Sequence, residues 1–188
     1  QLSAVIDFHL VTKWKTAGDS ILAAKLLARP NSQNILILGA GTVAFSLRQA
    51  YEDLFPNAHF SVWNRTSERA EKFAANFPNT IAVNDLEEAI SAADIISAAT
   101  MSSEPFINGK WLKPGQHIDL IGAYRPDMRE ADDTTLKRST IFVDSFETTI
   151  DHIGELKIPI ASAAIKREAV ISDFYNIQKF YRQMLILV

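Results

Sequence analysis

The fold is decided by the stretch Asn34-Ile35-Leu36-Ile37-Leu38-Gly39-Ala40-Gly41-Thr42-Val43-Ala44. A short apolar run enters a Gly-x-Gly-x-x-Ala turn and a helical pattern leaves it, which is the strand–turn–helix context of a dinucleotide fingerprint. Gly39 permits the tight turn, Gly41 lets the backbone approach a pyrophosphate, and Ala44 lets the helix pack close to the strand. The pyrophosphate would lie on the free N–H groups that open the helix, where Thr42 and Val43 stand. A Gly-rich turn in another kind of α/β protein is the alternative.

The second half of this signal lies where the next expected strand ends. That strand is His59-Phe60-Ser61-Val62-Trp63, and the residues after it are Asn64, Arg65 and Thr66. NAD sites usually place Asp or Glu here to accept hydrogen bonds from the ribose 2′-hydroxyl. An amide followed by a guanidinium instead suits a 2′-phosphate, which Arg binds through two parallel hydrogen bonds. The sequence therefore favours NADP(H) over NAD(H) and over FAD, whose sites also tend to carry an acid; a solvated surface Arg65 is the alternative.

Composition and charge exclude several classes of function. The chain has 188 residues, of which 47% are hydrophobic and 22% charged, as in one ordinary globular domain with a core. A net charge of −3 without a basic block gives nucleic-acid binding no electrostatic support. The absence of cysteine excludes disulfides and zinc–thiolate sites and fits a reducing, cytoplasmic location. No apolar run reaches membrane-spanning length, no signal peptide is visible, and the start at Gln1 leads us to expect a piece of a longer protein.

The rest of the pattern alternates strands with helices. Helices are expected over residues 19–28, 42–54 and 67–76, and after Asp85, which Glu88 follows at the spacing of a capping box. Strands are expected over residues 35–38, 60–63, 80–83, 94–98, 116–121 and 140–144. This alternation predicts an α/β protein with a doubly wound, mostly parallel sheet, a Rossmann domain.

Two further loops are candidates for the cofactor site, because ligands of such sheets bind beyond the carboxyl ends of the strands. Thr100 and Met101 belong to the loop 98–103, which is small and polar enough to line a ribose or a nicotinamide. Gly122 opens the loop 122–126, where a missing side chain would let the backbone approach the nicotinamide ring. An ordinary polar loop and a turn glycine are the respective alternatives.

Five segments carry a resemblance to a known family. They are Trp14-Lys15-Thr16-Ala17-Gly18-Asp19-Ser20, Gly39-Ala40-Gly41, Trp63-Asn64-Arg65-Thr66, Gly122-Ala123-Tyr124-Arg125-Pro126-Asp127-Met128-Arg129-Glu130 and Phe142-Val143-Asp144-Ser145. In this order they resemble the ornithine cyclodeaminase/μ-crystallin family, from about Ile6 to Tyr181. The Trp-Lys-Thr-Ala and Arg-Pro-Asp-Met-Arg-Glu pieces are the most specific, since the glycine motif alone fits many families.

The resemblance implies an NAD(P)-dependent enzyme of amino-acid or imino-acid metabolism, with a Rossmann domain and a second domain for substrate binding and dimerisation. It assigns residues 1–30 to a linking strand and helix, 31–150 to the dinucleotide-binding domain and 151–188 to a returning C-terminal segment. Most of the second domain would lie outside this sequence. We therefore expect a homodimer and turnover in the longer protein, and cofactor binding without turnover in these residues alone.

Two positions bear on chemistry through the resemblance. Lys15 falls where the family carries a basic residue, often Arg, that holds the substrate carboxylate; a solvated Lys before a helix is the alternative. Tyr124 falls where cyclodeaminase and alanine dehydrogenase members carry an Asp thought to act in proton transfer. A tyrosine ordinarily loses its proton near pH ~10, so it is a poor base at neutral pH, although it can donate a hydrogen bond. The sequence thus resembles the branch of Δ1-pyrroline-2-carboxylate and cyclic ketimine reductases, in which hydride passes to a C=N carbon.

The remaining candidates are expected to be structural. No metal site is predicted, because the four histidines are scattered without an i,i+4 pair: His9, His59, His117 and His152. A capped, solvated helix start is expected for one charged group: Asp127, Arg129, Glu130, Asp132 and Asp133. Packing on one helix face is expected for one apolar stripe: Phe174, Ile177, Tyr181 and Met184. Asp144 is expected to cap the helix that follows it.

Three functions remain open at this point. The first is an NADPH-dependent reductase of a cyclic imino acid, and the second is an ornithine cyclodeaminase that uses NAD. The third is a non-catalytic NADP-binding module, because a fold can outlive its chemistry. The pair Asn64-Arg65 and the missing Asp at position 124 favour the first over the second.

Overall fold

The computed structural model describes residues 3–177. Two compact units make up the chain: Gln1–Thr100 with Lys113–Ile121, and Met101–Leu112 with Gly122–Val188. Among the described residues, no helix is both long and apolar enough to cross a bilayer.

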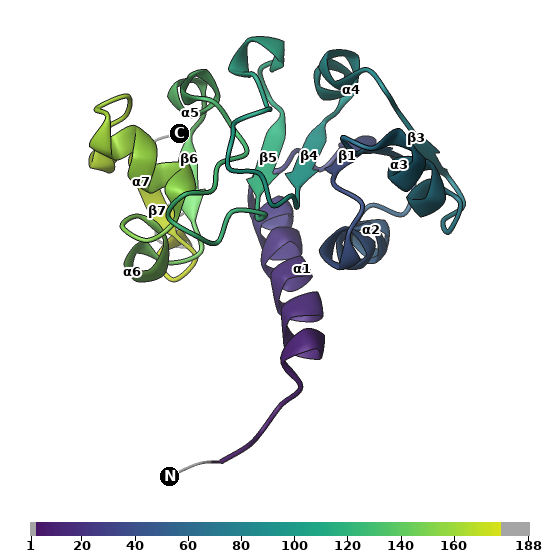
Figure 1. Ribbon diagram of the computed structural model, residues 1–188, viewed down its shortest axis with the longest axis horizontal. Coiled ribbons are helices and arrows are strands. Elements are labelled where there is room, and N and C mark those ends of the chain that lie inside the picture. Colours follow the sequence, from purple (N-terminus) through teal and green to yellow (C-terminus); the bar gives the residue numbers. More distant parts are fainter. Residues whose placement is uncertain (1–2, 178–188) are drawn as a thin grey trace. The chain divides into compact units, whose positions relative to one another are not determined.

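A five-stranded, fully parallel sheet forms the centre of the first unit (Figure 1). Its strands are β1 (Asn34–Leu38), β2 (His59–Trp63), β3 (Thr80–Ala82), β4 (Ile95–Ala98) and β5 (His117–Leu120). They lie in the order β3-β2-β1-β4-β5, so the chain crosses back after β3 to continue on the other side of β1. The apolar run Ile35–Leu38 is buried throughout, as a parallel strand covered on both faces requires. The doubly wound parallel sheet expected from the sequence is confirmed.

Helices cover both faces of this sheet. α1 (Phe8–Leu27), α2 (Thr42–Leu54) and α3 (Ser67–Ala74) share one hydrophobic core with the strands. Its buried members are Ala17, Ala24, Ile35, Ile37, Ala44, Leu47, Tyr51, Ala58, Phe60, Val62, Ala70, Phe73 and Ile95. α4 (Leu86–Ala92) connects β3 to β4, and Figure 1 shows it on the opposite side of the strands from α2. Burial on both faces explains why the central strands read as continuous apolar runs and do not alternate with polar residues.

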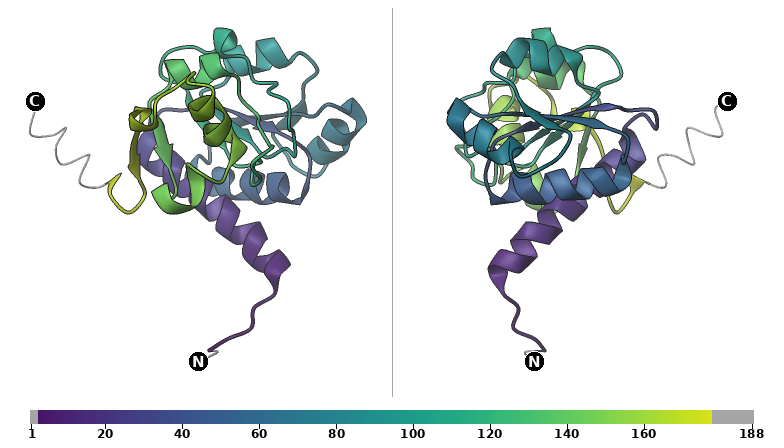
Figure 2. Two further views of the ribbon diagram at one scale, coloured as in Figure 1. Left: turned by 60° about the vertical axis from the view of Figure 1, so that its left-hand side comes forward. Right: turned by 90° about the vertical axis from the view of Figure 1, so that its right-hand side faces the viewer.

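α1 begins eleven residues earlier than the sequence predicts, at Phe8 instead of residue 19. The sequence prediction did not extend the helix to residues 8–18. Gly18 costs about 1 kcal/mol in a helix interior, and burial offsets this cost, since Ala17 and Ser20 are fully buried. Figure 2 shows the N-terminal half of α1 projecting from the sheet, and its large apolar side chains, Phe8 among them, are exposed.

Two helix starts in the first unit agree with the sequence. Asp85 is the N-cap of α4, and its carboxylate accepts a hydrogen bond from the Glu88 N–H at 2.9 Å. Thr66 is the N-cap of α3, which begins at Ser67 as expected. α3 ends at Ala74, two residues before the expected end, and the Asn76 side chain then donates to the Lys72 carbonyl at 2.6 Å.

The second unit is built around a short parallel pair of strands, β6 (Ile141–Val143) and β7 (Val170–Asp173). Its helices are η1 (Gly109–Trp111), α5 (Asp133–Arg138), α6 (Phe146–Thr149), α7 (Gly154–Ala161) and η2 (Arg167–Ala169). Their apolar side chains close a second core of Leu136, Ile141, Val143, Ile150, Leu156, Ile165 and Val170. Of these elements, the sequence predicted β6 and a capped helix start within the charged group 127–133. Asp132 of that group is the N-cap of α5, and its carboxylate accepts from the Thr135 N–H at 2.7 Å.

Two further predictions concern the ends of elements in this unit. Asp144 directly precedes the N-cap Ser145 of α6, and its carboxylate accepts from the Ser145 N–H and the Thr149 hydroxyl. The apolar stripe begins in a turn after β7, where Ile177 is buried as expected for packing. Its members Tyr181 and Met184 lie outside the described residues.

One fully buried cation ties α2 to the edge of the sheet. Arg48 is 0% exposed, and its guanidinium lies 3.7 Å from the ring centroid of Phe60. Its Nε donates to the Thr80 hydroxyl at 2.8 Å, and one Nη donates to the Pro78 carbonyl at 3.0 Å. Glu52, one turn further along α2, supplies the opposite charge at 3.1 Å. The side chain therefore supplies hydrogen-bond donors to polar atoms of Pro78 and Thr80 at the start of β3.

Replacing Arg48 by Ala is expected to lower the free energy of unfolding by about 3 kcal/mol, because it leaves a cavity and two unpaired acceptors. Urea unfolding followed by circular dichroism measures this change. Lys72→Ala, which removes an exposed cation from α3, serves as the control and is expected to change stability by less than about 0.5 kcal/mol. Equal stability of the two variants would show that Arg48 is dispensable.

Candidate functional site

The carboxyl ends of β1, β2 and β4 meet at the point where the sheet reverses direction. The Gly39 N–H donates to the Trp63 carbonyl at 2.8 Å, and the Ala99 N–H donates to the Leu38 carbonyl at 2.9 Å. β2 lies on one side of β1 and β4 on the other, so the loop after β1 leaves the sheet beside a gap between diverging connections. Such a switch point is where open α/β sheets bind their ligands.

Gly39 is required by the backbone at this point. Its φ is +110°, a conformation that L side chains rarely adopt. A Cβ atom there would lie 2.8 Å from the Ala99 carbonyl oxygen and 3.5 Å from Cγ2 of Thr100. The tight turn predicted for Gly39 is confirmed, and Thr100 lies directly beside it.

Gly41 has room for a side chain, whereas Gly39 has none. It is the N-cap of α2, exposed, with φ −95° and ψ −174°, and a Cβ atom there would meet nothing within 4 Å. Helical bonding begins when the Phe45 N–H donates to the Gly41 carbonyl at 3.2 Å, and no side chain caps the helix. The N–H groups of Thr42, Val43 and Ala44 therefore have no acceptor within the helix.

The start of α2 fits a pyrophosphate on three counts. The N–H groups of its first turn are available, the positive end of the helix dipole lies there, and no acidic residue stands in that turn to repel an anion. Ala44 is fully buried against the strands, so α2 begins close to the sheet. The empty space in front of Gly41 is what a phosphate approaching the backbone needs.

The turn after β2 presents a guanidinium to solvent. The Asn64 side chain donates to the Thr66 carbonyl at 3.0 Å, which shapes the turn and leaves the Arg65 side chain exposed. Within residues 3–177, Arg65 forms no ion pair. Its charge is thus not neutralised by a neighbouring carboxylate of the described chain, and it can bind an anionic group.

Lys15 lies inside α1. The alternative interpretation of the sequence, a solvated Lys before a helix, placed it outside. Its side chain is exposed, and its Nζ lies 2.5 Å from Oδ2 of Asp19, one turn further along the same helix. An exposed i,i+4 pair of this kind contributes about 0.3–0.5 kcal/mol. The assignment of Lys15 to a substrate carboxylate stays a prediction.

The remaining predicted residues belong to the second unit. Met101 and Tyr124 are largely exposed, whereas Gly122 is buried. The Arg125 guanidinium lies 5.8 Å from the ring centroid of Tyr124 and forms an ion pair with Asp127 at 3.1 Å. The assignment of these residues to a cofactor or a substrate stays a prediction.

The charged group after Tyr124 differs from its prediction. Asp127 is exposed as expected for a solvated helix start, but Arg129 and Glu130 are buried, so that prediction is wrong for them. Both turn inward because buried backbone groups of the loop need partners: one Nη of Arg129 donates to the Ala131 carbonyl at 3.0 Å, and Oε2 of Glu130 accepts from the Gly122 N–H at 2.9 Å.

Glu155, at the start of α7, is a buried carboxylate that sequence reasoning missed. Its oxygens accept from the N–H groups of Glu130 at 2.6 Å and Ala131 at 3.1 Å. Burial raises the pKa of this carboxyl, and the two backbone donors act in the opposite direction. The signal in the sequence that could have indicated this buried carboxylate is an acidic residue within the largely apolar segment of α7.

A second buried polar cluster lies in the core of the first unit, around Asp119 on β5. The Ser97 hydroxyl donates to Oδ2 of Asp119 at 2.9 Å. Burial raises the pKa of Asp119 and, together with the Asp119 charge, that of Tyr51; burial lowers the pKa of His117. These groups lie in the core of the unit and stabilise the contact between the sheet and its helices. Within residues 3–177, no His, Asp and Glu side chains form a group that could hold a metal ion.

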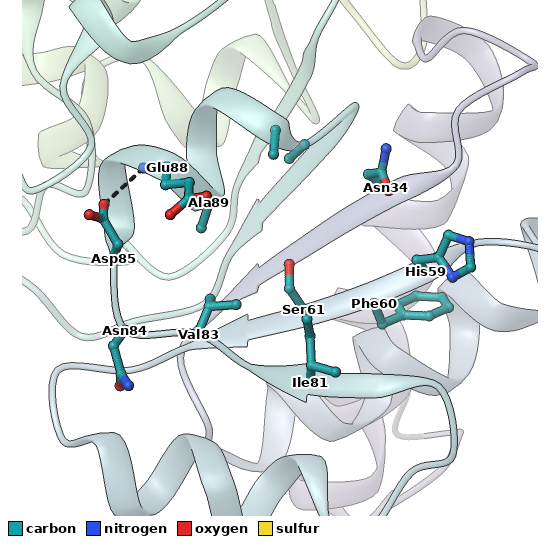
Figure 3. A pocket seen from close by; sticks show the side chains of 12 residues that line it. Asn34, His59, Phe60, Ser61, Ile81, Val83, Asn84, Asp85, Glu88 and Ala89 are labelled. Carbon is teal, nitrogen blue, oxygen red and sulfur yellow. Dashed lines mark hydrogen bonds between the residues drawn. The ribbon is translucent and has the colours of Figure 1, made fainter.

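A groove of about 400 Å³ runs along the other face of the sheet (Figure 3). Its lining comes from the strands β1–β3 and from α4: Asn34, His59, Phe60, Ser61, Ile81, Val83, Asn84, Asp85, Glu88, Ala89, Ala92 and Ala93. None of the residues predicted to bind cofactor or substrate belongs to this set. We therefore place the candidate site at the strand ends and not in the groove.

The fold defines a Rossmann-like domain, and comparison with known proteins narrows this class. A sequence model of the ornithine cyclodeaminase/mu-crystallin family matches residues 1–179, and the chain belongs to that family. It is 50% identical over 182 residues to Δ1-pyrroline-2-carboxylate reductase of Paracoccus denitrificans, an alignment that takes in 94% of this chain and 58% of the relative. It is 39% identical over 172 residues to mouse ketimine reductase mu-crystallin, with 91% of this chain and 55% of the relative aligned.

Solved structures give the same result. Δ1-pyrroline-2-carboxylate reductase of Thermococcus litoralis, in complex with NADH and L-proline, superposes with a TM-score of 0.85 at 29% identity over 89% of this chain and 54% of that one. An archaeal alanine dehydrogenase dimer with bound NAD gives a TM-score of 0.83 at 29% identity over 89% and 53%. The chain thus spans a little more than half the length of the relatives that it matches. The family membership expected from the sequence is confirmed.

The contrast between the two glycines predicts opposite effects of alanine. Gly39→Ala is expected to lower the free energy of unfolding by about 2–3 kcal/mol, because it combines a positive φ with a clash against Ala99. Gly41→Ala is expected to change it by less than about 0.5 kcal/mol, because its backbone and surroundings accept a Cβ. Urea denaturation of both variants measures the difference, and a tolerant Gly39 would contradict the turn described here.

Proposed function

We propose that the protein is an NADPH-dependent reductase of a cyclic imino acid of the Δ1-pyrroline-2-carboxylate class. The observation that carries this proposal is the uncapped start of α2 at Gly41, beside an exposed Arg65 where an acid would stand in an NAD site. Family membership and the names of the two relatives cited above support the class of reaction.

Each part of the candidate site has a role in this function. The first-turn N–H groups of α2 hold the pyrophosphate, and Thr100, beside Gly39, faces the ribose or nicotinamide. When bound, the nicotinamide supplies the hydride that reduces the C=N carbon. The side chain of Lys15 exchanges Asp19 for the substrate carboxylate, and that charge pair orients the imine. The Tyr124 hydroxyl donates a hydrogen bond and is not the base.

The preference for NADPH is a proposal about this chain's own residues. The solved relatives named above contain NADH or NAD, so they support a nicotinamide dinucleotide without deciding between the two forms. Arg65 forms no ion pair among the described residues, and the side-chain amide of the adjacent Asn64 donates its hydrogen bond to the Thr66 carbonyl. A 2′-phosphate would give the guanidinium a partner, whereas a 2′-hydroxyl would find no carboxylate at this turn.

Two other functions are alternatives. An ornithine cyclodeaminase using NAD is disfavoured, because the resemblance implies a proton-transfer group where Tyr124 stands, and tyrosine is a poor base at neutral pH. A non-catalytic NADP-binding module is separated from a reductase by a test for activity. We infer a homodimer for the active protein, in keeping with the dimeric alanine dehydrogenase relative.

Cofactor choice tests the role of Arg65. NADPH is expected to bind about tenfold or more tightly than NADH, because a charge-assisted bidentate contact is worth about 1.5–3 kcal/mol. Arg65→Ala is expected to abolish the preference by weakening NADPH alone, and Lys72→Ala, an equal charge change further along α3, is expected to leave it intact. Titration of both cofactors by fluorescence measures the affinities; equal affinities in the unaltered protein would exclude the proposal.

Isotope transfer tests the reaction. NADPH carrying deuterium at C4 is incubated with cyclic imino acids and the longest natural form of the protein that contains these residues. The label is expected at C2 of proline when Δ1-pyrroline-2-carboxylate is the substrate. Ammonia release from ornithine with NAD would support the cyclodeaminase, and cofactor binding without label transfer to any imine would support the non-catalytic module.

A further inference from the structure

One buried carboxylate closes the loop that follows β5. Glu130 is 0% exposed, and its Oε2 accepts a hydrogen bond from the backbone N–H of Gly122, eight residues earlier, at 2.9 Å. The two ends of the loop are buried, whereas the side chains at its tip, Tyr124 to Asp127, are exposed. The Glu130 side chain thus sets where the backbone of Gly122 lies.

A second buried carboxylate fixes the first. Glu155 is 6% exposed, and both of its oxygens are used: Oε2 accepts from the Glu130 N–H at 2.6 Å and Oε1 from the Ala131 N–H at 3.1 Å. The Arg129 charge favours the ionised form of Glu155, against the burial that raises its pKa. Glu155 therefore anchors the backbone from which the Glu130 side chain projects.

The start of α7 presses against the same loop. The Gly154 N–H donates to the Arg125 carbonyl at 2.9 Å, and a Cβ at position 154 would lie 2.7 Å from the Pro126 carbonyl and closer still to that of Met128. The loop is thus held by its own Glu130 and, from α7, by backbone and Glu155. Burying a carboxylate costs free energy unless it is hydrogen-bonded, and both of these accept hydrogen bonds from backbone N–H groups of the loop.

We propose that Glu130 and Glu155 are positioning residues, which hold the backbone of loop 122–126 in one fixed geometry. This inference rests on the proposed function and on the prediction, made from the sequence, that Gly122 approaches the nicotinamide ring. Hydride transfer depends on the orientation of the ring, and a loop misplaced by about 1 Å can cost a hundredfold in rate. Neither carboxylate is assigned contact with the cofactor or the substrate; both act through the backbone of Gly122.

Paired ligands distinguish this role from general stability. NADPH carries the nicotinamide, whereas 2′-phospho-ADP-ribose lacks it and keeps the 2′-phosphate, the adenosine and the pyrophosphate. Glu130→Ala leaves the Gly122 N–H without an acceptor and is expected to weaken NADPH about tenfold while 2′-phospho-ADP-ribose changes less than about twofold. Glu147→Ala, which removes an exposed carboxylate from α6 of the same unit, is the control and is expected to change neither affinity.

The isosteric amides give a sharper contrast. Oε2 of Glu130 accepts the Gly122 N–H, and the amide oxygen of Glu130→Gln can accept the same bond, so this variant is expected to retain both affinities within about twofold. Glu155 accepts from two backbone N–H groups, so Glu155→Gln sets an NH2 group against one of them and is expected to weaken NADPH selectively despite its equal size. Hydrogen exchange of the Gly122 amide is expected to be faster in Glu130→Ala and unchanged in Glu130→Gln.

The outcomes separate this inference from the proposed function. If the unaltered protein binds neither ligand, the proposed function fails, and the positioning role fails with it. If the unaltered protein binds both ligands, two results for Glu130→Ala overturn the positioning role alone. One is an equal loss of affinity for NADPH and 2′-phospho-ADP-ribose. The other is no loss of either affinity while the Gly122 amide exchanges faster. If Glu130→Ala does not fold, the two glutamine variants decide, and equal affinities in both contradict the proposal.

Discussion

The backbone conformation at Gly39 is the constraint on which the rest of the site depends. A φ of +110° turns the chain sharply at the end of β1, and contact with the Ala99 carbonyl leaves no room for a side chain. This turn brings the start of α2 close to the sheet, where Ala44 is fully buried. As a result, the first-turn N–H groups of α2 open onto the switch point between β1 and β4, where they and the helix dipole can bind an anion.

The side chains around this turn have a secondary role, because they select what the backbone can hold. Arg65 stands on the next strand end without a carboxylate partner among the described residues, and the turn that presents it is shaped by Asn64. Lys15 is balanced by Asp19 through an exposed pair of small energy. The proposed function assigns a phosphate to Arg65 and a carboxylate to Lys15.

The sequence predicted the first unit well because local signals and burial agree there. The apolar run before Gly39 could only be a buried parallel strand, and the Asp85 cap set the start of α4. α1 was predicted too short, because only residues 19–28 were expected to be helical, whereas the helix begins at Phe8, with Ala17 fully buried. The family was recognisable from short segments that no propensity argument would supply.

The second unit was predicted poorly, for a physical reason. Its elements are short, and α7 carries a proline in its interior. The periodicity of apolar residues therefore predicts these elements poorly. Arg129 and Glu130 occur in a polar stretch typical of a solvated helix start, yet both are buried. Their partners are backbone atoms whose orientation depends on α7, some twenty-five residues later in the chain. A pairing between a side chain and a distant backbone N–H leaves no pattern in one sequence.

The most direct test of this account is Gly41→Val. The backbone of Gly41 lies in the β region, which suits valine, and nothing within 4 Å obstructs the new side chain, so the unfolding free energy is expected to change by less than about 1 kcal/mol. The added side chain would occupy the space of the pyrophosphate, so NADPH and NADH are expected to bind at least about a hundredfold more weakly. Gly18→Val is the control. Gly18 lies in α1 and, like Gly41, has nothing within 4 Å of an added Cβ, and this variant is expected to leave both affinities unchanged. Unaltered cofactor binding by a folded Gly41→Val protein would show that the pyrophosphate does not lie at the start of α2.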